Sequence, residues 1–269
     1  MTATRSASRW LVLLLVWAAS AAAQAATVQL EELTWTELRE RVAAGATTVL
    51  LPIGGTEQNG PHMTLGKHNM RVKLLAARIA ERLGNAVVAP VLAYVPEGGI
   101  EPPTQHMRYP GTITVSDAAF EATLEGAARS LRKHGLRDVV LLGDHGGYRA
   151  SLDRVATRLN REWGNTARVH ALPEYYRAAQ DDFAAALAAR GFAKDEIGPH
   201  AGLADTALML ALDPSQVRMD VAAARPRGAV QDGVAGDPRR ATAELGRPAV
   251  EHIVEVSVAA IRARARPAK

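Results

Sequence analysis

The sequence predicts a single three-layer α/β domain with a mainly parallel sheet. Short apolar, β-branched runs alternate with longer segments of helical period, and the clearest runs lead into glycine-containing polar loops. Strands that are apolar throughout and joined by helices are typical of parallel sheets covered on both faces. The chain has 269 residues, of which 48% are hydrophobic and 22% charged. That length and composition are sufficient for one well-buried core.

The order of the elements follows from periodicity and capping residues. Thr34 and Glu37 form a capping box at the start of the first helix, and Asp117 is the expected cap of the third. The loops with the least regular pattern are 54–69 and 95–112. The predicted strands are 47–53, 85–94, 138–142 and 167–172. The predicted helices are 35–44, 71–83, 117–134, 148–163, 175–190, 203–212 and 241–264.

Residues 1–25 are typical of a secretory signal peptide. Arg5 and Arg9 precede the apolar run 10–17, and small residues then lead to an A-x-A site at 23–25. The apolar run is much shorter than the roughly 20 residues of a spanning helix, which disfavours the alternative of an uncleaved membrane anchor. We therefore expect a periplasmic or secreted protein, free of the membrane after cleavage, with residues 26–269 as its one folded domain.

Composition excludes several classes of function. The chain contains no cysteine, which excludes disulfides, zinc–thiolate clusters and thiol nucleophiles. Its formal charge of +4 includes Arg5 and Arg9 of the predicted signal peptide. The small remaining excess of positive charge is spread over a whole domain, which is not typical of a nucleic-acid-binding protein. We expect a small-molecule substrate and no nucleic-acid partner.

Histidines and carboxylates gather in loops that follow predicted strands. Glu57 and His68 follow strand 47–53, and Asp144 and His145 follow strand 138–142. Ligand sites of parallel sheets lie beyond the carboxyl ends of the strands, so these side chains are expected to converge. Imidazole nitrogens and carboxylate oxygens are the ligands of a borderline cation such as Zn²⁺ or Mn²⁺. A third segment, with His200 and Asp205, precedes and opens an apolar helix.

Other catalytic motifs are absent from the sequence. It contains no G-x-S-x-G, H-E-x-x-H or G-x-G-x-x-G pattern, which argues against a serine hydrolase elbow, a zincin helix and a dinucleotide site. Segment 60–68 only faintly resembles a phosphate-binding loop, because its spacing is one residue too long and His68 replaces the required Ser or Thr. The remaining isolated histidines are expected to be structural or solvated: His106, His134, His170 and His252.

The sequence resembles the creatininase family, which includes creatinine amidohydrolase, formamide deformylases and a peptide-maturing protease. The resemblance extends from about Leu50 to about Arg262. It implies a parallel-sheet α/β fold, a homo-oligomer and a metal site that hydrolyses amide C–N bonds. The motifs that carry it, in the family's order, are LPIGGTEQ at 51–58, GPH at 60–62, YPGTI at 109–113, DHGG at 144–147, HAG at 200–202 with DT at 205–206, and GVAGDPRRAT at 233–242.

The resemblance also assigns roles to individual metal-site positions. Glu57 matches the family's first metal glutamate, and His145 matches the histidine of its N-G-H motif. A family histidine falls on Asn59, the metal-bridging aspartate falls on His68, and a further glutamate ligand falls on Gly147. A carboxylate can bridge two cations, whereas a neutral imidazole binds one. These departures therefore disfavour a site with two metal ions.

The remaining correspondences concern the substrate side. His200 matches the family's histidine near the substrate, and Asp205 conservatively replaces a glutamate. The glutamate that precedes this histidine in creatininase is Pro199 here, which argues against creatinine as the substrate. Asp144 replaces the asparagine of N-G-H and is expected to orient a ligand or to bind the metal itself.

These observations lead to one functional hypothesis and two alternatives. Glu57, His68 and His145 offer one oxygen and two nitrogens, the composition of a single catalytic zinc site. We expect one Zn or Mn ion per chain, a metal-activated water as nucleophile, and catalytic roles for His200 and Asp205. The expected substrate is a small amide, lactam or formamide. The alternatives are a metal-dependent lactonase and a non-catalytic periplasmic binding protein on the same fold.

Overall fold

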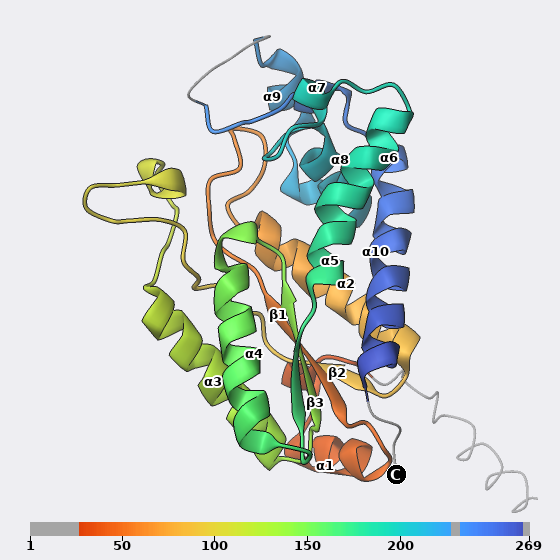
Figure 1. Cartoon of the computed structure of the whole chain (residues 1–269). Helices are drawn as coiled ribbons and strands as arrows, with labels where there is room; N and C mark the ends of the chain where they lie inside the picture. Colours follow the sequence, from red (N-terminus) through yellow and green to blue (C-terminus); the bar gives the residue numbers. More distant parts are fainter. Residues whose placement is uncertain (1–26, 227–231, 266–269) are drawn as a thin grey trace, which may run out of the picture.

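The computed structural model describes residues 27–226 and 232–265 (Figure 1). The predicted signal peptide lies outside the described residues. Four parallel strands form one sheet with the order β2-β1-β3-β4. The strands are β1 (Thr48–Ile53), β2 (Ala86–Val88), β3 (Asp138–Gly143) and β4 (Arg168–Ala171). The predicted α/β class with a parallel sheet is confirmed.

The order of the strands determines where a site can form. β1 and β3 are neighbours over six residue pairs, from Thr48 opposite Asp138 to Ile53 opposite Gly143. The chain leaves β1 for β2 on one side and later crosses to β3 and β4 on the other side. The carboxyl ends of β1 and β3 are therefore the switch point of the sheet, where a ligand crevice is expected.

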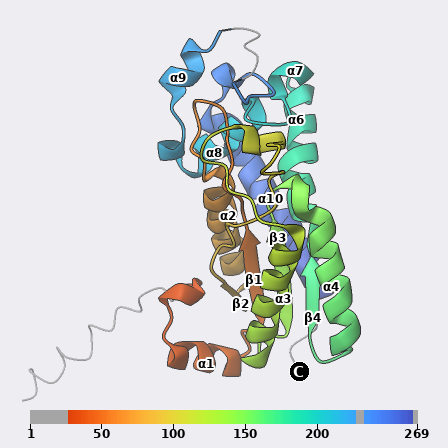
Figure 2. The same cartoon turned by 90° about the vertical axis from the view of Figure 1, so that its left-hand side faces the viewer.

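Helices cover both faces of the sheet (Figures 1 and 2). Residues alternate between the faces along each strand. Leu50 and Val140 point to one core, and Val49 and Val139 point to the other. The first core is closed by α2 (Lys67–Leu83), α5 (Pro173–Arg177), α6 (Phe183–Ala189), α8 (Leu203–Leu212) and α10 (Ala243–Arg264). The second is closed by α1 (Trp35–Ala43), α3 (Asp117–Lys133) and α4 (Arg149–Trp163).

Shorter elements complete the described chain. Residues 173–189 form one nearly continuous helix, in which a π-helical segment, Ala178–Asp182, separates α5 from α6. Two short helices, α7 (Lys194–Ile197) and α9 (Met219–Ala224), flank α8 in the sequence. None of the helices within the described ranges is long and apolar enough to cross a membrane. The 3-10 turns are Leu30–Glu32, Gln105–Arg108, Gly146–Tyr148, Pro214–Gln216 and Pro238–Arg240.

Three predicted boundaries were wrong, for local reasons. The strand expected at 85–94 is only Ala86–Val88, since Pro90 lacks an N–H group and the chain beyond it forms only an isolated bridge to β1. Ser116, not Asp117, caps α3 by accepting the N–H of Ala119. Helix α2 begins at Lys67 instead of Arg71. This last difference places residues 67 and 68 in a helical turn instead of a loop.

The packing of α10 on α8 gives a testable prediction. A Cβ atom on Gly246 of α10 would overlap the carbonyl group of Ala207 and lie 2.9 Å from the Cβ of Ala211. We expect Gly246→Ala to lower the free energy of unfolding by about 1–3 kcal/mol, as overpacked cores do. This should hold although alanine is intrinsically the better helix former.

The matched control is Gly126→Ala in α3, where a Cβ would meet no atom within 4 Å. This variant should gain about 0.5–1 kcal/mol in urea denaturation, because glycine is a poor helix former. Equal stability of the two variants would contradict the close approach of α8 and α10.

Candidate metal centre

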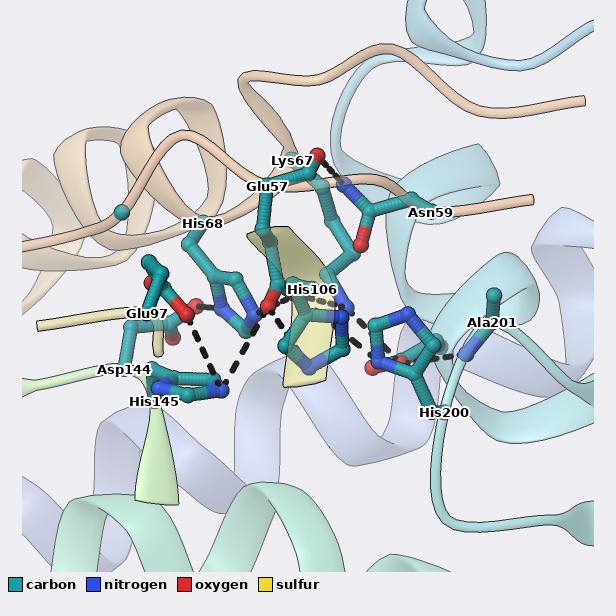
Figure 3. Close-up of polar contacts among 12 residues, drawn as sticks. Glu57, Asn59, Lys67, His68, Glu97, His106, Asp144, His145, His200 and Ala201 are labelled. Atoms are coloured by element: carbon teal, nitrogen blue, oxygen red, sulfur yellow. Dashed lines mark hydrogen bonds and ion pairs between the residues drawn. The ribbon is translucent and has the colours of Figure 1, made fainter. Parts of the chain in front are cut away.

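Five segments of the chain meet beyond the ends of β1 and β3 (Figure 3). They are the loop after β1, the first two turns of α2, the connection between β2 and α3, the turn after β3, and the segment that precedes and opens α8. In this order they contribute Glu57; Lys67, His68 and Arg71; Glu97 and His106; Asp144 and His145; and His200 and Asp205.

Glu57 lies at the centre of this cluster and has no exposed surface. Its Oε1 lies 2.8 Å from His68 Nε2 and 3.6 Å from Lys67 Nζ. Burial opposes ionisation of Glu57, but the charge and hydrogen bond of His68, followed by the charge of Lys67, outweigh it and hold the pKa of Glu57 below its usual range. Its Oε2 faces the other way and has no hydrogen-bond partner.

Three side chains lie near the free oxygen of Glu57, and together with Glu57 they can hold a metal ion. One ligand atom from each of Glu57, Glu97, His106 and His145 lies within 4.8 Å of the other three. Nε2 of His106 and Nε2 of His145 lie 3.2 and 3.4 Å from Glu57 Oε2. Glu97 is fully buried, and neither of its carboxylate oxygens has a hydrogen-bond partner. Buried polar atoms are rarely left unpaired. A proton shared by Glu97 and Glu57 or a cation bound between them would pair these three oxygens, and the two imidazoles beside them favour a cation site.

The charge states of these residues bear directly on cation binding. Burial, followed by the negative charge of Glu57 and a hydrogen bond with it, raises the pKa of Glu97 to about 9, so near pH 7 this carboxyl keeps a proton that a bound cation would displace. Burial, followed by the nearby His68, lowers the pKa of His145 to about 3, and burial also lowers the pKa of His106. Both imidazoles are therefore neutral near pH 7, as metal ligands must be. Two imidazoles and two carboxylates fit zinc or manganese.

His68 and Asp144 lie directly behind this group. His68 Nδ1 lies 2.6 Å from Asp144 Oδ2, while its Nε2 faces Glu57. Asp144 also accepts hydrogen bonds from Arg71 Nε at 2.8 Å and from the hydroxyl of Tyr175 at 2.6 Å. Burial opposes its ionisation, but Arg71 and then His68 hold the pKa of Asp144 below its usual range.

Asp205 joins a second set of buried charges. It accepts hydrogen bonds from Lys67 Nζ at 3.0 Å and from Arg71 Nη1 at 2.7 Å. A third hydrogen bond, of 2.9 Å, comes from the N–H of Ala201, whose φ of 53° is unusual for a residue with a side chain. Asp205 therefore holds the backbone next to His200.

His200 presents one ring nitrogen to the site. Its Nε2 lies 3.0 Å from the main-chain oxygen of Gln58, which can only accept, so Nε2 donates and Nδ1 keeps its lone pair. That Nδ1 lies 3.7 Å from Glu57 Oε1. Burial, followed by the charge of Lys67, lowers the pKa of His200 to about 4. A neutral imidazole with a free lone pair can accept a proton.

Two further residues brace the loops that carry the site. Asn59 is fully buried, and its side-chain amide donates to the carbonyl oxygens of Glu57 and Thr64. Tyr148 is also buried, and its hydroxyl oxygen accepts the N–H groups of Asp144 and His145. Both residues hold the backbone of these loops in place.

The structure brings all six predicted site residues together but gives them different surroundings. Glu57 and His145 belong to the four residues that can share a cation. His68 and Asp144 lie beside them but are hydrogen-bonded to each other, so their ligand role stays a prediction. His200 reaches the site, whereas Asp205 contacts Lys67, Arg71 and the backbone. Of the four residues that can share a cation, two were missed: Glu97, which received no role, and His106, which was interpreted as structural. The YPGTI motif just after His106 was the available signal.

The raised pKa of Glu97 predicts how stability depends on pH in the metal-free protein. The ordinary pKa of a glutamate is 4.5, and the pKa of Glu97 is about 9 in the folded chain. Between these values the folded chain keeps a proton that the unfolded chain has released, so stability falls as the pH rises. Relative to wild type, metal-free Glu97→Gln should gain at least about 1.4 kcal/mol between pH 5 and pH 8, the equivalent of one pKa unit.

Urea denaturation of both metal-free proteins at the two pH values measures this difference. An offset between wild type and variant that does not change with pH would show that Glu97 ionises normally.

The sequence matches known proteins over most of its length. Residues 31–261 match the family model Creatininase, described as creatinine amidohydrolase. The chain is 34% identical over 200 residues to the creatinine amidohydrolase of Pseudomonas putida, which covers 70% of this chain and 73% of the relative. It is 29% identical over 219 residues to the mycofactocin precursor peptide peptidase of Mycolicibacterium smegmatis, covering 74% of this chain and 77% of the relative.

Solved structures of creatininase are similar in fold. One described as creatininase Mn has a TM-score of 0.72 and 29% identity, covering 90% of this chain and 100% of that chain. A creatininase variant of Zn-Zn type gives the same TM-score, identity and coverage. Together with the family match, these similarities confirm the resemblance seen in the sequence: the chain belongs to the creatininase family.

Proposed function

We propose that this protein hydrolyses a C–N bond of a small amide, lactam or formamide and uses one divalent cation, zinc or manganese, per chain. Membership of the creatininase family makes it a hydrolase and supports metal-dependent amide hydrolysis in general terms. The observation that carries the proposal is the set of unpartnered buried oxygens on Glu57 and Glu97, opposite His106 and His145. A cation held there would lower the pKa of bound water and polarise the attacked carbonyl group.

His200 is the group best placed to move a proton. Its Nδ1 lies on the Glu57 side of the ring, and its lowered pKa keeps the imidazole neutral near pH 7. The side-chain nitrogen of Gln58 lies 3.1 Å from His106 Nδ1, and the main-chain oxygen of the same residue accepts the hydrogen bond of His200 Nε2 at 3.0 Å. Gln58 therefore fixes two imidazole rings relative to each other, and their centroids are 4.6 Å apart. A base held in this way loses little freedom when the substrate binds.

The pattern of exposure indicates how the substrate approaches. Glu57, Glu97 and Lys67 are buried, whereas the side chains of His106, His145 and His200 are 21, 16 and 16% exposed. A substrate therefore meets the imidazole rings first. We propose a substrate other than creatinine, because Pro199 occupies the position of a glutamate that creatininase uses before this histidine.

Two alternatives predict different outcomes at the same site. A metal-dependent lactonase would use the same groups, because hydrolysis of C–O and C–N acyl bonds needs the same activated water. Turnover of a matched lactone and lactam of equal ring size separates these two activities. A periplasmic binding protein that lacks metal would leave the oxygens of Glu57 and Glu97 unpaired, which disfavours it.

Removal of the metal and loss of His200 should have distinct effects. The chelator-treated protein should be inactive on a panel of amides, lactams and formamides, and zinc or manganese should restore turnover. His200→Ala should keep its metal content but lose about 10²- to 10⁴-fold in kcat, the usual contribution of a general base. The control is His252→Ala, which removes a surface imidazole paired with Asp182. An active metal-free enzyme would contradict the proposal.

We propose further that the protein is exported and assembles as a homo-oligomer. Residues 1–25, with two arginines, an apolar run and an A-x-A site, support export. Export predicts that the protein from a periplasmic fraction begins near Ala26 in mass spectrometry, and light scattering of that material measures its assembly. An intact Met1 on the periplasmic protein would contradict cleavage.

A further inference from the structure

The two carboxylate oxygens of Glu57 have different surroundings, and Oε1 faces two nitrogen donors of the protein. His68 Nε2 lies 2.8 Å and Lys67 Nζ 3.6 Å from Oε1, whereas Oε2 has no hydrogen-bond partner (Figure 3). A carboxylate that bridges two cations must offer one oxygen to each. In this chain Glu57 offers only one oxygen to a cation, because the other is already used.

His68 is fixed as a hydrogen-bond donor. Its two ring nitrogens lie 2.8 Å from Glu57 Oε1 and 2.6 Å from Asp144 Oδ2. Ionised carboxylates only accept hydrogen bonds, whereas a metal ligand must present a nitrogen without a proton. Asp144 is itself held by Arg71 and Tyr175, so the ring cannot turn without breaking buried hydrogen bonds. This geometry makes His68 a positioning residue for Glu57.

The ammonium group of Lys67 occupies a place that resembles a cation site. It lies 3.0 Å from Asp205 Oδ2 and 3.6 Å from Glu57 Oε1. Nδ1 of His200 lies 3.7 Å from the same oxygen of Glu57. Two carboxylates and an imidazole are metal-ligand types, yet here a buried lysine, 1% exposed, provides the positive charge.

The formal charges of the buried cluster agree with a single ion. Its four carboxylates belong to Glu57, Glu97, Asp144 and Asp205, and its two permanent cations to Lys67 and Arg71. Both nitrogens of His68 donate, so its ring counts as a third cation, and the other histidines are neutral. One divalent cation then brings the sum to +1, and a second would bring it to +3. Uncompensated charge is strongly unfavourable in a buried site.

We propose that Lys67 and His68 take the place of a second metal ion beside Glu57. The site then binds one ion through Glu57 Oε2, Glu97, His106 and His145. This inference rests on the proposed function, because it refines the same metal site, and it can fail while that function stands.

Saturation of the wild-type protein with metal tests the inference without any variant. The metal-free protein is titrated with zinc and, separately, with manganese, and bound metal is counted by native mass spectrometry and elemental analysis. One ion per chain is expected at saturation. Two ions would overturn the inference and the proposed stoichiometry of one ion per chain, but would leave metal-dependent hydrolysis intact. No uptake would defeat both the inference and the proposed function.

Histidine variants test which imidazoles are ligands. His68→Ala should still bind one zinc ion, with its affinity reduced by less than about tenfold, whereas His106→Ala should lose about 100-fold or more. His252→Ala is the control for loss of a histidine elsewhere. Loss of zinc from His68→Ala as severe as from His106→Ala would make His68 a ligand and overturn the inference. Should His68→Ala not fold, His68→Gln keeps an N–H donor for Glu57 and carries the same expectations.

A Lys67 variant tests directly whether the ammonium group of this lysine occupies the place of a second metal ion. Lys67→Ala vacates the position between Glu57 and Asp205, so this variant should bind a second ion that wild type does not bind. Lys73→Ala, an exposed lysine on the same helix, is the matched control and should saturate at one ion. A Lys67→Ala protein that folds and still saturates at one ion would contradict the role given to Lys67.

Discussion

Glu57 has no exposed surface, and its ionised carboxylate is stable there because His68 and Lys67 face one of its oxygens. Desolvation alone would favour its protonated form, and the adjacent positive charge and hydrogen bond reverse that preference. The other oxygen stays free and faces His106 and His145. The centre depends on this arrangement, in which Oε1 of Glu57 contacts His68 and Lys67 while Oε2 stays available to a ligand.

The same donors connect the centre to the fold. Lys67 and Arg71 lie in the first two turns of α2, where they contact Asp144 after β3 and Asp205 in α8. Loss of one partner from a buried ion pair typically costs about 3–5 kcal/mol, because a charge is left uncompensated. The interactions that hold Glu57 therefore also hold α2 and α8 on the carboxyl edge of the sheet. Lys67, Arg71, Asp144 and Asp205 support the centre from within the protein and are buried, so a substrate cannot reach these charged groups.

The part of the site that was predictable follows directly from the sheet. Glu57 and His145 come after apolar runs that form neighbouring strands, so their convergence needed only the parallel topology. Glu97 and His106 lie in a connection without periodicity, and only the tertiary path of that connection brings them to Glu57. The ligand role predicted for His68 from the resemblance is in competition with its hydrogen bonds, since α2 begins early enough to turn this ring between two carboxylates. Residue types in a sequence identify possible metal ligands. Only the fold shows which of their atoms are already used in hydrogen bonds.

The most direct test of this account is a crystal structure of the zinc-loaded protein with anomalous scattering measured on both sides of the zinc edge. One anomalous peak per chain is expected in the centre, bonded to Glu57 Oε2, Glu97, His106 and His145. The ring of His68 should remain between Glu57 and Asp144. A peak bonded to His68 or Asp144, or a second peak at the position of the Lys67 ammonium group, would contradict it.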